Sequence, residues 1–379
     1  MLFNEMLAYM VNSGKGVSDL IFVTGRKKQI EEFGELKNPS FTGELDNILD
    51  AQDVHVIANN ILGEKEWLWE DIKKRGSCDC TYILENICRF RVNIFKQNGN
   101  LAVVMRRLQS TIPAIEDLKL APVFKKMIDE KNGVIFITGG TGQGKTTTLA
   151  ALLNELNTKK AVHVVTLEDP IEYLHPHKKS TFSQRELGQD FPSFSDGLRA
   201  ALRQAPKVIL VGEIRDRDTM EIALTAAETG HLVLSTMHTI NAGQTINRIL
   251  GFFTSDEQEQ IRIRLADTVR YVCSQKLIPR LGGGRILVTE VMGNSLRSRE
   301  TILLGENEAR SYNDIIEKGG TAGWHSFDQS LEKFYENGSI TEETTITYCS
   351  DKNKMRRTVD KIKQGSGVIH DSGLKLEIM

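Results

Sequence analysis

A glycine-rich segment near the middle of this 379-residue chain could bind phosphate. It reads Gly139-Gly140-Thr141-Gly142-Gln143-Gly144-Lys145-Thr146 and fits the pattern G-x-x-x-x-G-K-[ST]. Its glycines let backbone N–H groups converge on phosphate oxygens, and a helix that begins here would point its positive end at the same anion. Lys145 would reach the β- and γ-phosphates, and the hydroxyl of Thr146 would bind Mg²⁺.

The surroundings of this segment favour a nucleotide site over a glycine-rich turn with a solvated lysine. Residues 133–137 form a continuous apolar run that predicts a buried strand, and residues 146–156 predict a helix. A strand, the loop and a helix in this order are the context in which the pattern binds nucleotides. We therefore expect ATP and Mg²⁺ to be bound here, with Thr147 included in the nucleotide-binding set.

Two glutamates follow predicted strands and could act on water. Glu168 directly follows the apolar run 162–167, and Glu213 comes shortly after the run 208–211. The carboxyl ends of parallel strands face the ligand crevice of such a sheet, so both side chains are expected there. Glu168 would orient water or a magnesium-bound water, and Glu213 would polarise the attacking water. The alternatives are an acidic turn closed by Pro170 for the first and a helix-start carboxylate for the second.

Two histidines bracket the next predicted strand, 232–235. His231 precedes it and His238 follows it. Only His238 is expected at the crevice, where it could sense the γ-phosphate or position water, whereas His231 is better suited to ordering the strand entrance. A lone histidine is commonly structural, so both remain candidates for the catalytic set.

Arginines gather on a predicted hairpin in the first hundred residues. Residues 89–95 alternate polar and apolar side chains, residues 101–106 form a partner strand, and Asn98-Gly99 is the turn signal between them. The arginines are Arg89, Arg91, Arg106 and Arg107. They could form a charge clamp on a nucleotide or a solvated sheet edge, and their spacing leaves both interpretations open.

The elements around these residues predict an α/β protein with two domains. Residues 1–109 contain a strand candidate at 19–23, a helix at 53–62 and the hairpin, and residues 110–117 form a linker. Residues 118–351 alternate strands and helices, which predicts a parallel sheet in a three-layer domain. Beyond Ala266 the chain is expected to be mostly helical, with one strand at 286–291. Residues 352–379 are expected to form a charged, mobile tail.

Composition is ordinary for a globular protein, with 40% hydrophobic and 26% charged residues. The net charge of −2 argues against direct nucleic-acid binding. No signal peptide or apolar run of membrane-spanning length is seen, so we expect a cytoplasmic protein. The five cysteines, an odd number without framework spacing, suit a reducing compartment, and Cys78 and Cys80 are expected to be surface thiols.

Four segments together resemble the conserved boxes of the secretion-superfamily ATPases. GGTGQGKTTT, TLEDPIEYLHPHKKS, VILVGEIRD and TAAETGHLVLSTMHT look like the Walker A motif, Asp box, Walker B motif and His box of that superfamily. Within it, LEDPIEYLHPHKKS, RFRVNIFKQNG and WHSFDQSL are most similar to the PilT family of type IV pilus retraction ATPases. The resemblance extends from Ser18 to about Asp351.

This resemblance implies a RecA-like P-loop NTPase domain preceded by a smaller PAS-like α/β domain. It implies a hexameric ATPase motor that powers type IV pilus retraction, and hence twitching motility, through ATP hydrolysis. Glu213 would be the catalytic glutamate, supported by Glu168, His238 and His231. Arg89, Arg91 and Arg106 would approach ATP across the subunit interface.

The resemblance also implies partners and a location. The partners would be five further copies of the chain, an inner-membrane pilus platform protein and a paralogous retraction ATPase. Association with the inner membrane would be peripheral, through the pilus machine. The alternatives are an ATPase of a type II or type IV secretion or conjugation system and a non-hydrolysing scaffold subunit. Lys145, Thr146 and Glu213 argue against the scaffold, and the lack of a four-cysteine zinc insert favours a retraction motor over an extension motor.

The sequence departs from the family pattern at a few positions. Gly140 stands where Pro is usual, Gln143 where Ser is usual, and Thr146 where Ser is common. Thr146 keeps the hydroxyl that Mg²⁺ needs. Lys207 precedes the Walker B strand where Asp is frequent, so no magnesium role is expected there, and Gln109 replaces a Pro after the Arg106 strand.

Overall fold

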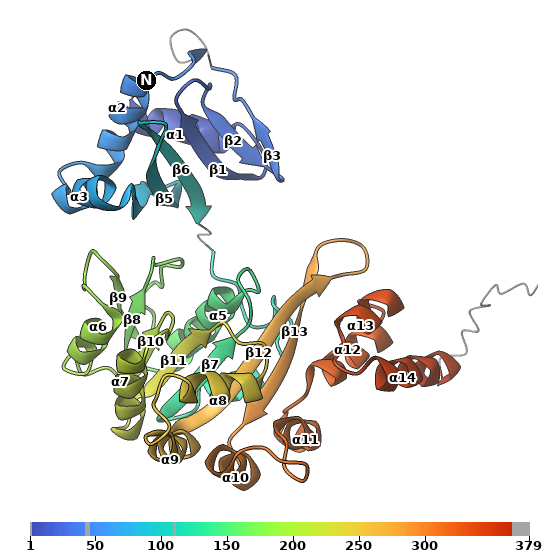
Figure 1. Ribbon diagram of the computed structural model, residues 1–379. Helices are drawn as coiled ribbons and strands as arrows, with labels where there is room; N and C mark the ends of the chain where they lie inside the picture. Colours follow the sequence, from blue (N-terminus) through green and yellow to red (C-terminus); the bar gives the residue numbers. More distant parts are fainter. Residues whose placement is uncertain (1, 42–45, 109–110, 366–379) are drawn as a thin grey trace, which may run out of the picture. The chain divides into compact units, whose positions relative to one another are not determined.

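The computed structural model describes residues 2–41, 46–108 and 111–365. The chain divides into two units, which are described separately (Figure 1). The first contains residues 1–112 and 170–174, and the second contains residues 113–169 and those from 175 on. The described part has no helix with the length and apolar character needed to cross a membrane.

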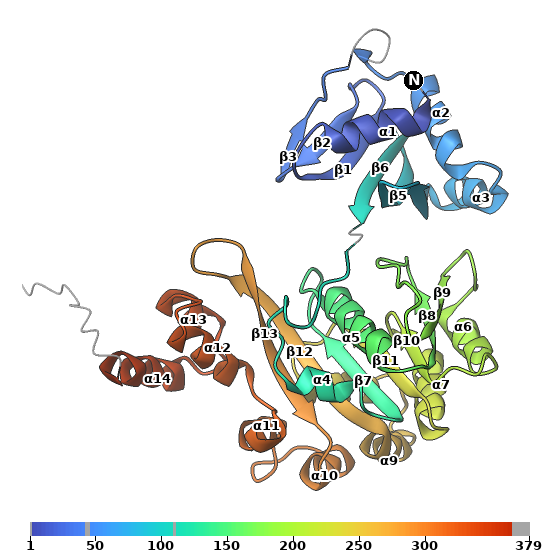
Figure 2. The ribbon, with the colours of Figure 1, turned by 180° about the vertical axis from the view of Figure 1, so that it is seen from behind.

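The first unit is built on a six-stranded antiparallel sheet with the order β3-β2-β1-β6-β5-β4. The strands are β1 (Val17–Val23), β2 (Gln29–Glu32), β3 (Glu35–Lys37), β4 (Ser77–Leu84), β5 (Cys88–Gln97) and β6 (Asn100–Leu108). The helices are α1 (Phe3–Asn12), α2 (Ala51–Leu62) and α3 (Glu66–Arg75). Figure 2 shows this sheet with its helices from behind.

Hydrophobic alternation explains how this first sheet folds. Phe90, Val92 and Ile94 of β5 are fully buried against the helices, while Arg91 and Asn93 between them point to the other face. The predicted hairpin of β5 and β6 is confirmed, with Gln97 paired to Asn100. Asn98 and Gly99 have φ values of 46° and 79°, as a two-residue hairpin turn requires.

The prediction of surface thiols is wrong for Cys78. This residue lies in β4, and its side chain is only 4% exposed and packs in the core of the first unit. Burial raises the pKa of the thiol to about 11, so Cys78 is an unreactive core residue.

The second unit is a seven-stranded sheet with the order β13-β12-β7-β11-β10-β8-β9. Its strands are β7 (Gly133–Thr138), β8 (His163–Glu168), β9 (Thr181–Glu186), β10 (Val208–Val211), β11 (Leu232–Met237), β12 (Val269–Pro279) and β13 (Arg285–Gly293). Six strands are parallel, and β13 pairs with β12 in the antiparallel sense. The alternation of strands and helices confirms the predicted α/β class.

Helices cover both faces of this sheet (Figures 1 and 2). The helices are α4 (Val123–Met127), α5 (Lys145–Lys159), α6 (Phe194–Ala201), α7 (Arg217–Glu228), α8 (Ala242–Leu250), α9 (Gln258–Thr268), α10 (Leu296–Leu304), α11 (Tyr312–Lys318), the 3-10 helix η2 (Gly320–Ala322), α12 (Phe327–Glu336), α13 (Glu342–Tyr348) and α14 (Lys352–Gly365). Val134 and Phe136 pack toward α6 to α9, whereas Ile135 and Ile137 pack toward α4 and α5. The strand β7 is therefore buried on both faces.

The region beyond Ala266 differs from the sequence expectation. The strand at 286–291 is confirmed within β13, but residues 269–279 form β12 rather than a helix. The four successive residues 272–275 in the middle of this strand are all buried, so both of its faces are covered there and the sequence lacks the alternation of a half-buried strand. A register shift between Val269 and Tyr271 further interrupts the pattern.

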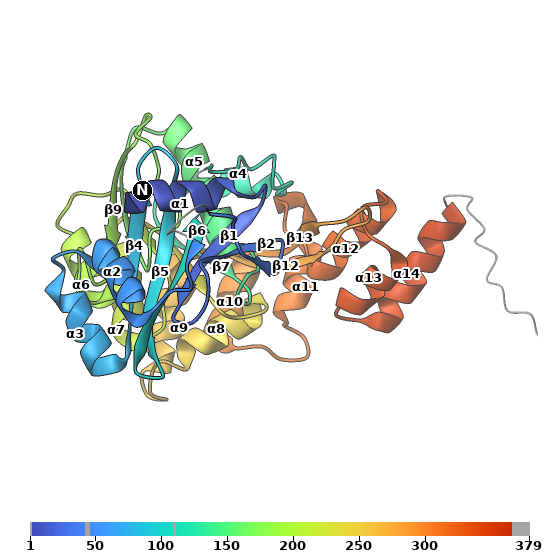
Figure 3. The same cartoon turned by 90° about the horizontal axis from the view of Figure 1, so that it is seen from above.

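The end of the described chain is also more ordered than expected. Residues 352–365 form α14, and its Met355 and Val359 are buried in a small core with Phe327, Leu331 and Ile340. Figure 3 shows α12, α13 and α14 grouped beside the β12–β13 hairpin. The expected mobile tail therefore differs from the structure at 352–365, and residues 366–379 lie outside the described part.

Candidate active site

The glycine-rich loop leaves β7 and enters α5, as the spacing predicts. Gly144 is the N-cap of α5 with φ 80°, and Gly142 has φ 73°, so both adopt the left-handed region that favours glycine. A Cβ on Gly139 would lie 2.6 Å from the carbonyl oxygen of Gln275. Gly140 has room for a side chain, since its nearest neighbour would be 3.7 Å away, so the family's proline is not excluded by space.

Lys145 lies over this loop. Its side chain is 9% exposed, and its Nζ donates to the carbonyl oxygens of Gly139 at 2.9 Å and Gly140 at 3.0 Å. The ammonium group therefore sits where the loop turns and is desolvated. Thr146 and Thr147 follow in the first turn of α5 and are half-buried, while Thr141 and Gly142 are exposed at the tip of the loop.

Gln143 ties the loop to β12. Its Oε1 accepts from the backbone N–H of Leu277 at 2.5 Å, and its carbonyl oxygen accepts from Nε2 of Gln275 at 2.6 Å. A serine hydroxyl could not span the same distance. Gln143, which stands where the family usually has Ser, thus fixes the phosphate loop to a strand that is about 130 residues away in the sequence.

Glu168 ends β8, as expected, and is 7% exposed. Its Oε1 accepts from the hydroxyl of Thr166 at 2.7 Å and from Nε2 of Gln184 at 3.1 Å. Gln184 also accepts from the backbone N–H of His175 through its Oε1 at 2.8 Å. The carboxylate is therefore held in one orientation by two side-chain donors that the sequence did not single out.

Glu213 follows β10 and is held close to the crevice by a tight turn. The N–H of Gly212 donates to Leu167 at 2.8 Å, and the hydroxyl of Thr236 donates to the carbonyl of Gly212 at 2.7 Å. Arg215 donates from Nη2 to Oε2 of Glu213 at 2.7 Å, and Nε2 of His238 lies 3.4 Å from the same oxygen.

These contacts set the charge of Glu213. Burial by itself would raise the pKa of this carboxyl. The hydrogen bond and positive charge of Arg215, with smaller effects of His238 and Lys145, outweigh burial and hold the pKa below its ordinary value. Glu213 is therefore a carboxylate at neutral pH.

The two histidines lie at opposite ends of β11. His238 follows the last residue of the strand and contacts Glu213, as its position at the carboxyl end predicts. His231 precedes the first residue, where its Nδ1 lies 3.0 Å from the carbonyl oxygen of Ala226 and its backbone oxygen accepts from Gly133. A six-residue strand separates the ends by about 20 Å, so His231 lies at the entrance of the strand and does not reach Glu213 within this unit.

Arg89, Arg91 and Arg106 are on the face of the first unit's sheet that is turned away from its core, whereas Arg107 pairs with the buried Phe90 and so lies on the other face. Arg91 of β5 and Arg106 of β6 are directly opposite each other. Nε of Arg106 donates to Asp19 at 3.0 Å, Arg91 lies 3.9 Å from Asp79, and Arg89 donates to the carbonyl of Ile171 at 2.5 Å. Gln109, the departure that follows this strand, lies outside the described residues.

Lys207 has no part in the crevice. It precedes β10, where its N–H donates to the carbonyl of His163 and its own carbonyl accepts from Leu232. Glu213 lies at the other end of β10, so the presence of Lys207 where the family frequently has Asp removes no magnesium ligand from the candidate site.

The residues present fit Mg²⁺ in the manner expected of a nucleotide-bound ion. No group of three or more His, Cys, Asp or Glu side chains within residues 2–41, 46–108 and 111–365 could hold a metal. Mg²⁺ is often held by one or two protein oxygens, water and substrate phosphates. The hydroxyl of Thr146 at the start of α5 is such an oxygen donor. Glu168 ends β8, and Glu213 follows the neighbouring strand β10 of the same sheet.

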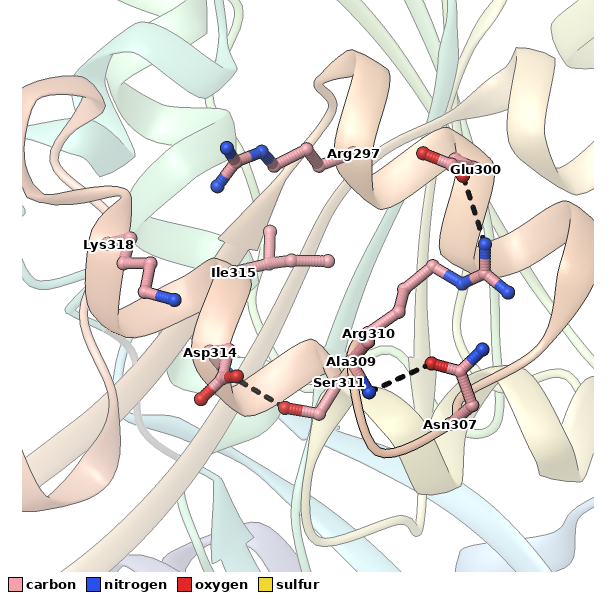
Figure 4. Close-up of a pocket in the computed structure, with 9 residues that line it drawn as sticks. All are labelled: Arg297, Glu300, Asn307, Ala309, Arg310, Ser311, Asp314, Ile315 and Lys318. Atoms are coloured by element: carbon pink, nitrogen blue, oxygen red, sulfur yellow. Dashed lines mark hydrogen bonds and ion pairs between the residues drawn. The ribbon is translucent and has the colours of Figure 1, made fainter.

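A separate surface pocket lies between α10 and α11 (Figure 4). Its volume is about 490 Å³. It is lined by Arg297, Glu300, Asn307, Ala309, Arg310, Ser311, Asp314, Ile315 and Lys318. Arg310 donates to Glu300 at 2.9 Å, so part of its charge is paired internally. None of the candidate catalytic or nucleotide-binding residues lines this pocket.

Comparison with known proteins agrees with this arrangement. The model of the "Type II/IV secretion system protein" family matches residues 76–283. The type IV pilus retraction ATPase PilT of Pseudomonas aeruginosa is 37% identical over 339 residues, which cover 89% of this chain and 95% of PilT. The type IV pilus ATPase PilU of the same organism is 34% identical over 383 residues, covering 100% of this chain and 97% of PilU.

A solved structure extends the similarity to three dimensions. The crystal structure of the pilus retraction motor PilT with bound ADP aligns with a TM-score of 0.83 and 35% identity, covering 94% of this chain and 99% of that one. The likeness therefore includes both the N-terminal unit and the P-loop unit. On these grounds the chain belongs to the type II/IV secretion system protein family and, within it, to the PilT-type pilus retraction ATPases.

Proposed function

We propose that this chain is a motor ATPase that hydrolyses ATP to drive the retraction of a type IV pilus. The observation that carries the proposal is the convergence of the Lys145 loop, Glu168 and the Glu213–His238 pair at one edge of the sheet, in a chain that matches PilT over nearly its whole length. The loop supplies phosphate binding, and the glutamates supply carboxylates for water.

Each residue has a distinct role in the proposed reaction. The backbone of residues 139–144 binds the phosphates, and Lys145 turns from the loop carbonyls toward the β- and γ-phosphates when nucleotide is bound. The ionised Glu213 orients and polarises the attacking water. Glu168, fixed by Thr166 and Gln184, orients a second water, and His238 stabilises the charge of Glu213.

Mg²⁺ would be held by the hydroxyl of Thr146, and it would neutralise charge on the phosphate oxygens. The protein's own contribution at this position is the first turn of α5, which presents Thr146 beside Lys145. Both residues come from a helix whose N-terminus faces the phosphate site, so the helix dipole adds to the same attraction.

Arg91 and Arg106 are the side chains best suited to complete the site from a neighbouring copy. They lie opposite each other on the exposed face of the first unit, at 46% and 70% side-chain exposure. Guanidinium groups match phosphate oxygens with paired hydrogen bonds. A ring of six copies would bring each such pair to another copy's nucleotide, and Arg89 would assist from the same strand.

The motor would act on the pilus machine through partners. An inner-membrane platform protein would receive the motion, a paralogue resembling PilU would assist it, and the chain would be cytoplasmic and bound peripherally at the membrane. Opening and closing of subunit interfaces upon hydrolysis would supply the movement, since γ-phosphate contacts hold the closed state.

Deletion of the gene in its own organism tests the proposal. Since none of the proposed catalytic residues acts on the filament, pili should still form, and the strain should be piliated or hyperpiliated but defective in twitching motility. A bald strain that still expresses its extension ATPase would favour an assembly motor. A strain with normal pili and motility but defective protein or DNA transfer would favour a secretion or conjugation ATPase.

A further inference from the structure

Three buried polar residues, Thr138, Ser274 and Glu290, lie in one row across the sheet of the second unit, at the level where its parallel strands end, and Met237 of β11 continues the row. Strand register places Met237 opposite Thr138, Thr138 opposite Ser274, and Ser274 opposite Glu290. Thr138 and Ser274 are fully buried, and the hydroxyl of Thr138 donates to that of Ser274 at 2.9 Å. This row lies one residue before the phosphate loop on β7 and one residue before His238 on β11.

The row ends at Glu290, whose buried carboxyl group accepts a hydrogen bond from the start of helix α8. Its side chain is 7% exposed, and its Oε1 accepts from the backbone N–H of Ala242, the first residue of α8, at 3.0 Å. The first N–H groups of a helix have no hydrogen-bond partner inside the helix. A second such group, the backbone N–H of Gln244, donates to the side-chain oxygen of Asn241 at 2.8 Å. Glu290 thus fixes the start of α8 to β13.

The loop that carries His238 is consequently held at both ends. It consists of residues 238–241, between Met237 at the end of β11 and Ala242 at the start of α8. Met237 is held by its pairing with β7, and Ala242 is held by Glu290. The hydroxyl of Thr239 in the loop lies 2.7 Å from that of Thr245 in α8. A displacement of α8 would therefore move His238 relative to Glu213.

We propose that Glu290 is a positioning residue for hydrolysis, which holds the loop 238–241 and with it His238 beside Glu213. This inference rests on the proposed roles of Glu213 and His238. It assigns no direct contact between Glu290 and nucleotide. The carboxyl belongs to the β12–β13 hairpin, and Gln143 of the phosphate loop is hydrogen-bonded to the same hairpin. One hairpin therefore holds both the phosphate loop and the loop 238–241 in position.

Two substitutions at this position separate the hydrogen bond from the charge. Glu290→Gln keeps an oxygen acceptor for the Ala242 N–H but removes the charge, whereas Glu290→Ala removes both. Glu308→Gln, at an exposed glutamate in the loop after α10, is the matched control. Circular dichroism and ATP-analogue binding establish that each purified full-length variant is folded.

The expected result is a loss in turnover without a matching loss in substrate affinity. Glu290→Ala should lower kcat for ATP hydrolysis by about tenfold or more, with KM changed by less than about threefold, and the control should match the wild type. In a Glu213→Gln background, Glu290→Ala should add little, because both act on the same step.

Failure of this inference and failure of the proposed function give different results. If Glu213→Gln abolishes turnover while Glu290→Ala is as active as the wild type, Glu290 is only a helix cap. Equal losses in kcat and binding, or full additivity with Glu213→Gln, would overturn the positioning role as well. If Glu213→Gln itself turns over ATP normally, the proposed catalytic function fails, whatever Glu290 does.

A pH profile provides a second readout, which also serves if Glu290→Ala does not fold. Burial raises the pKa of Glu290 to about 7, Asp328 of α12 adds to the rise, and the Ala242 N–H and Lys276 of β12 oppose it. The first turn of α8 has no ionisable side chain facing the carboxyl. The wild type should gain kcat as pH rises through about 7, and Glu290→Gln should lack this gain. Superimposable profiles would overturn the inference.

Discussion

Nε2 of His238 lies 3.4 Å from Oε2 of Glu213, although the two residues follow different strands. The strands β10 and β11 are parallel neighbours, so their carboxyl ends bring both side chains to one edge of the sheet. Arg215 donates to the same oxygen at 2.7 Å. Glu213 therefore lies between two groups that favour its ionised form, and it can interact with water as a carboxylate.

Lys145→Ala should abolish ATP turnover and weaken nucleotide binding. The ammonium group is the buried cation of the phosphate loop, and in similar loops it contacts the transferred phosphate directly. Binding of a fluorescent ATP analogue and phosphate release measure both effects. Lys159→Ala, at the far end of the same helix, is a suitable control because its lysine forms an ion pair with Glu155 at the surface. Normal turnover in a folded Lys145→Ala protein would refute the P-loop assignment.

Glu213→Gln should retain ATP binding while turnover falls by about 10²-fold or more, because the carboxylate acts on water rather than on phosphate. Glutamine keeps the size of the side chain and can still accept from Arg215. Equilibrium binding and single-turnover hydrolysis separate the two effects. A parallel decline of both quantities would indicate a structural or metal-linked role for this glutamate.

Arg106→Ala should depress hydrolysis by about 10³-fold if the arginine completes a neighbour's site. The substitution also leaves Asp19 buried without this ion pair, since the Asp19 side chain is only 7% exposed. Asp19→Asn is therefore the control, because it breaks the same pair and keeps the guanidinium. Only Arg106→Ala should lose activity by the proposed mechanism.

Mixed assemblies test whether the arginine acts between subunits. Arg106→Ala and Lys145→Ala proteins, each inactive alone, should regain partial ATPase activity when mixed, because some interfaces then combine an intact arginine with an intact loop. The measurement is phosphate release across a series of mixing ratios, at constant total protein. Lack of recovery at every ratio would argue that each site is complete within one chain.

Glu290→Gln should stabilise the protein at pH 8 and much less at pH 5. The folded-state pKa is about 7 and the ordinary value is 4.5, so the folded state keeps a proton that the unfolded state has lost between these pH values. Stability attributable to Glu290 therefore falls as pH rises from about 4.5 to 7. The difference amounts to on the order of 3 kcal/mol at pH 8.

Thermal unfolding of the wild type, Glu290→Gln and Glu308→Gln at both pH values measures this effect. The wild type and Glu290→Gln share every other titrating group, and Glu308→Gln shows the effect of removing an exposed glutamate, so the comparison isolates residue 290. A variant that is less stable than the wild type at pH 8, or a Tm difference that is independent of pH, would contradict the assignment of the shift to burial.

Much of the candidate site could be predicted because its signals are local. The phosphate loop needs glycines and a lysine at fixed spacing within eight residues, and the glutamates follow short apolar runs that predict buried strands. The strand-end rule then brings Glu168, Glu213 and His238 to one edge. The same rule correctly separated His231 from His238, since they stand at the two ends of β11.

Tertiary structure alone decided which residues hold these groups in place. Gln275 and Glu290 come from β12 and β13, and nothing in their local sequence marks them as partners of Gln143 and Ala242.

Two elements were not predicted from the sequence. The strand β12 was missed because a strand that is buried on both faces loses the period-two pattern. The helix α14 was missed because its packing depends on the contact of Met355 and Val359 with a distant core. Local spacing determines which chemistry a segment can perform, whereas a single polar contact between distant segments, such as that of Gln143 with Gln275, forms only when the chain folds and leaves no pattern in the local sequence.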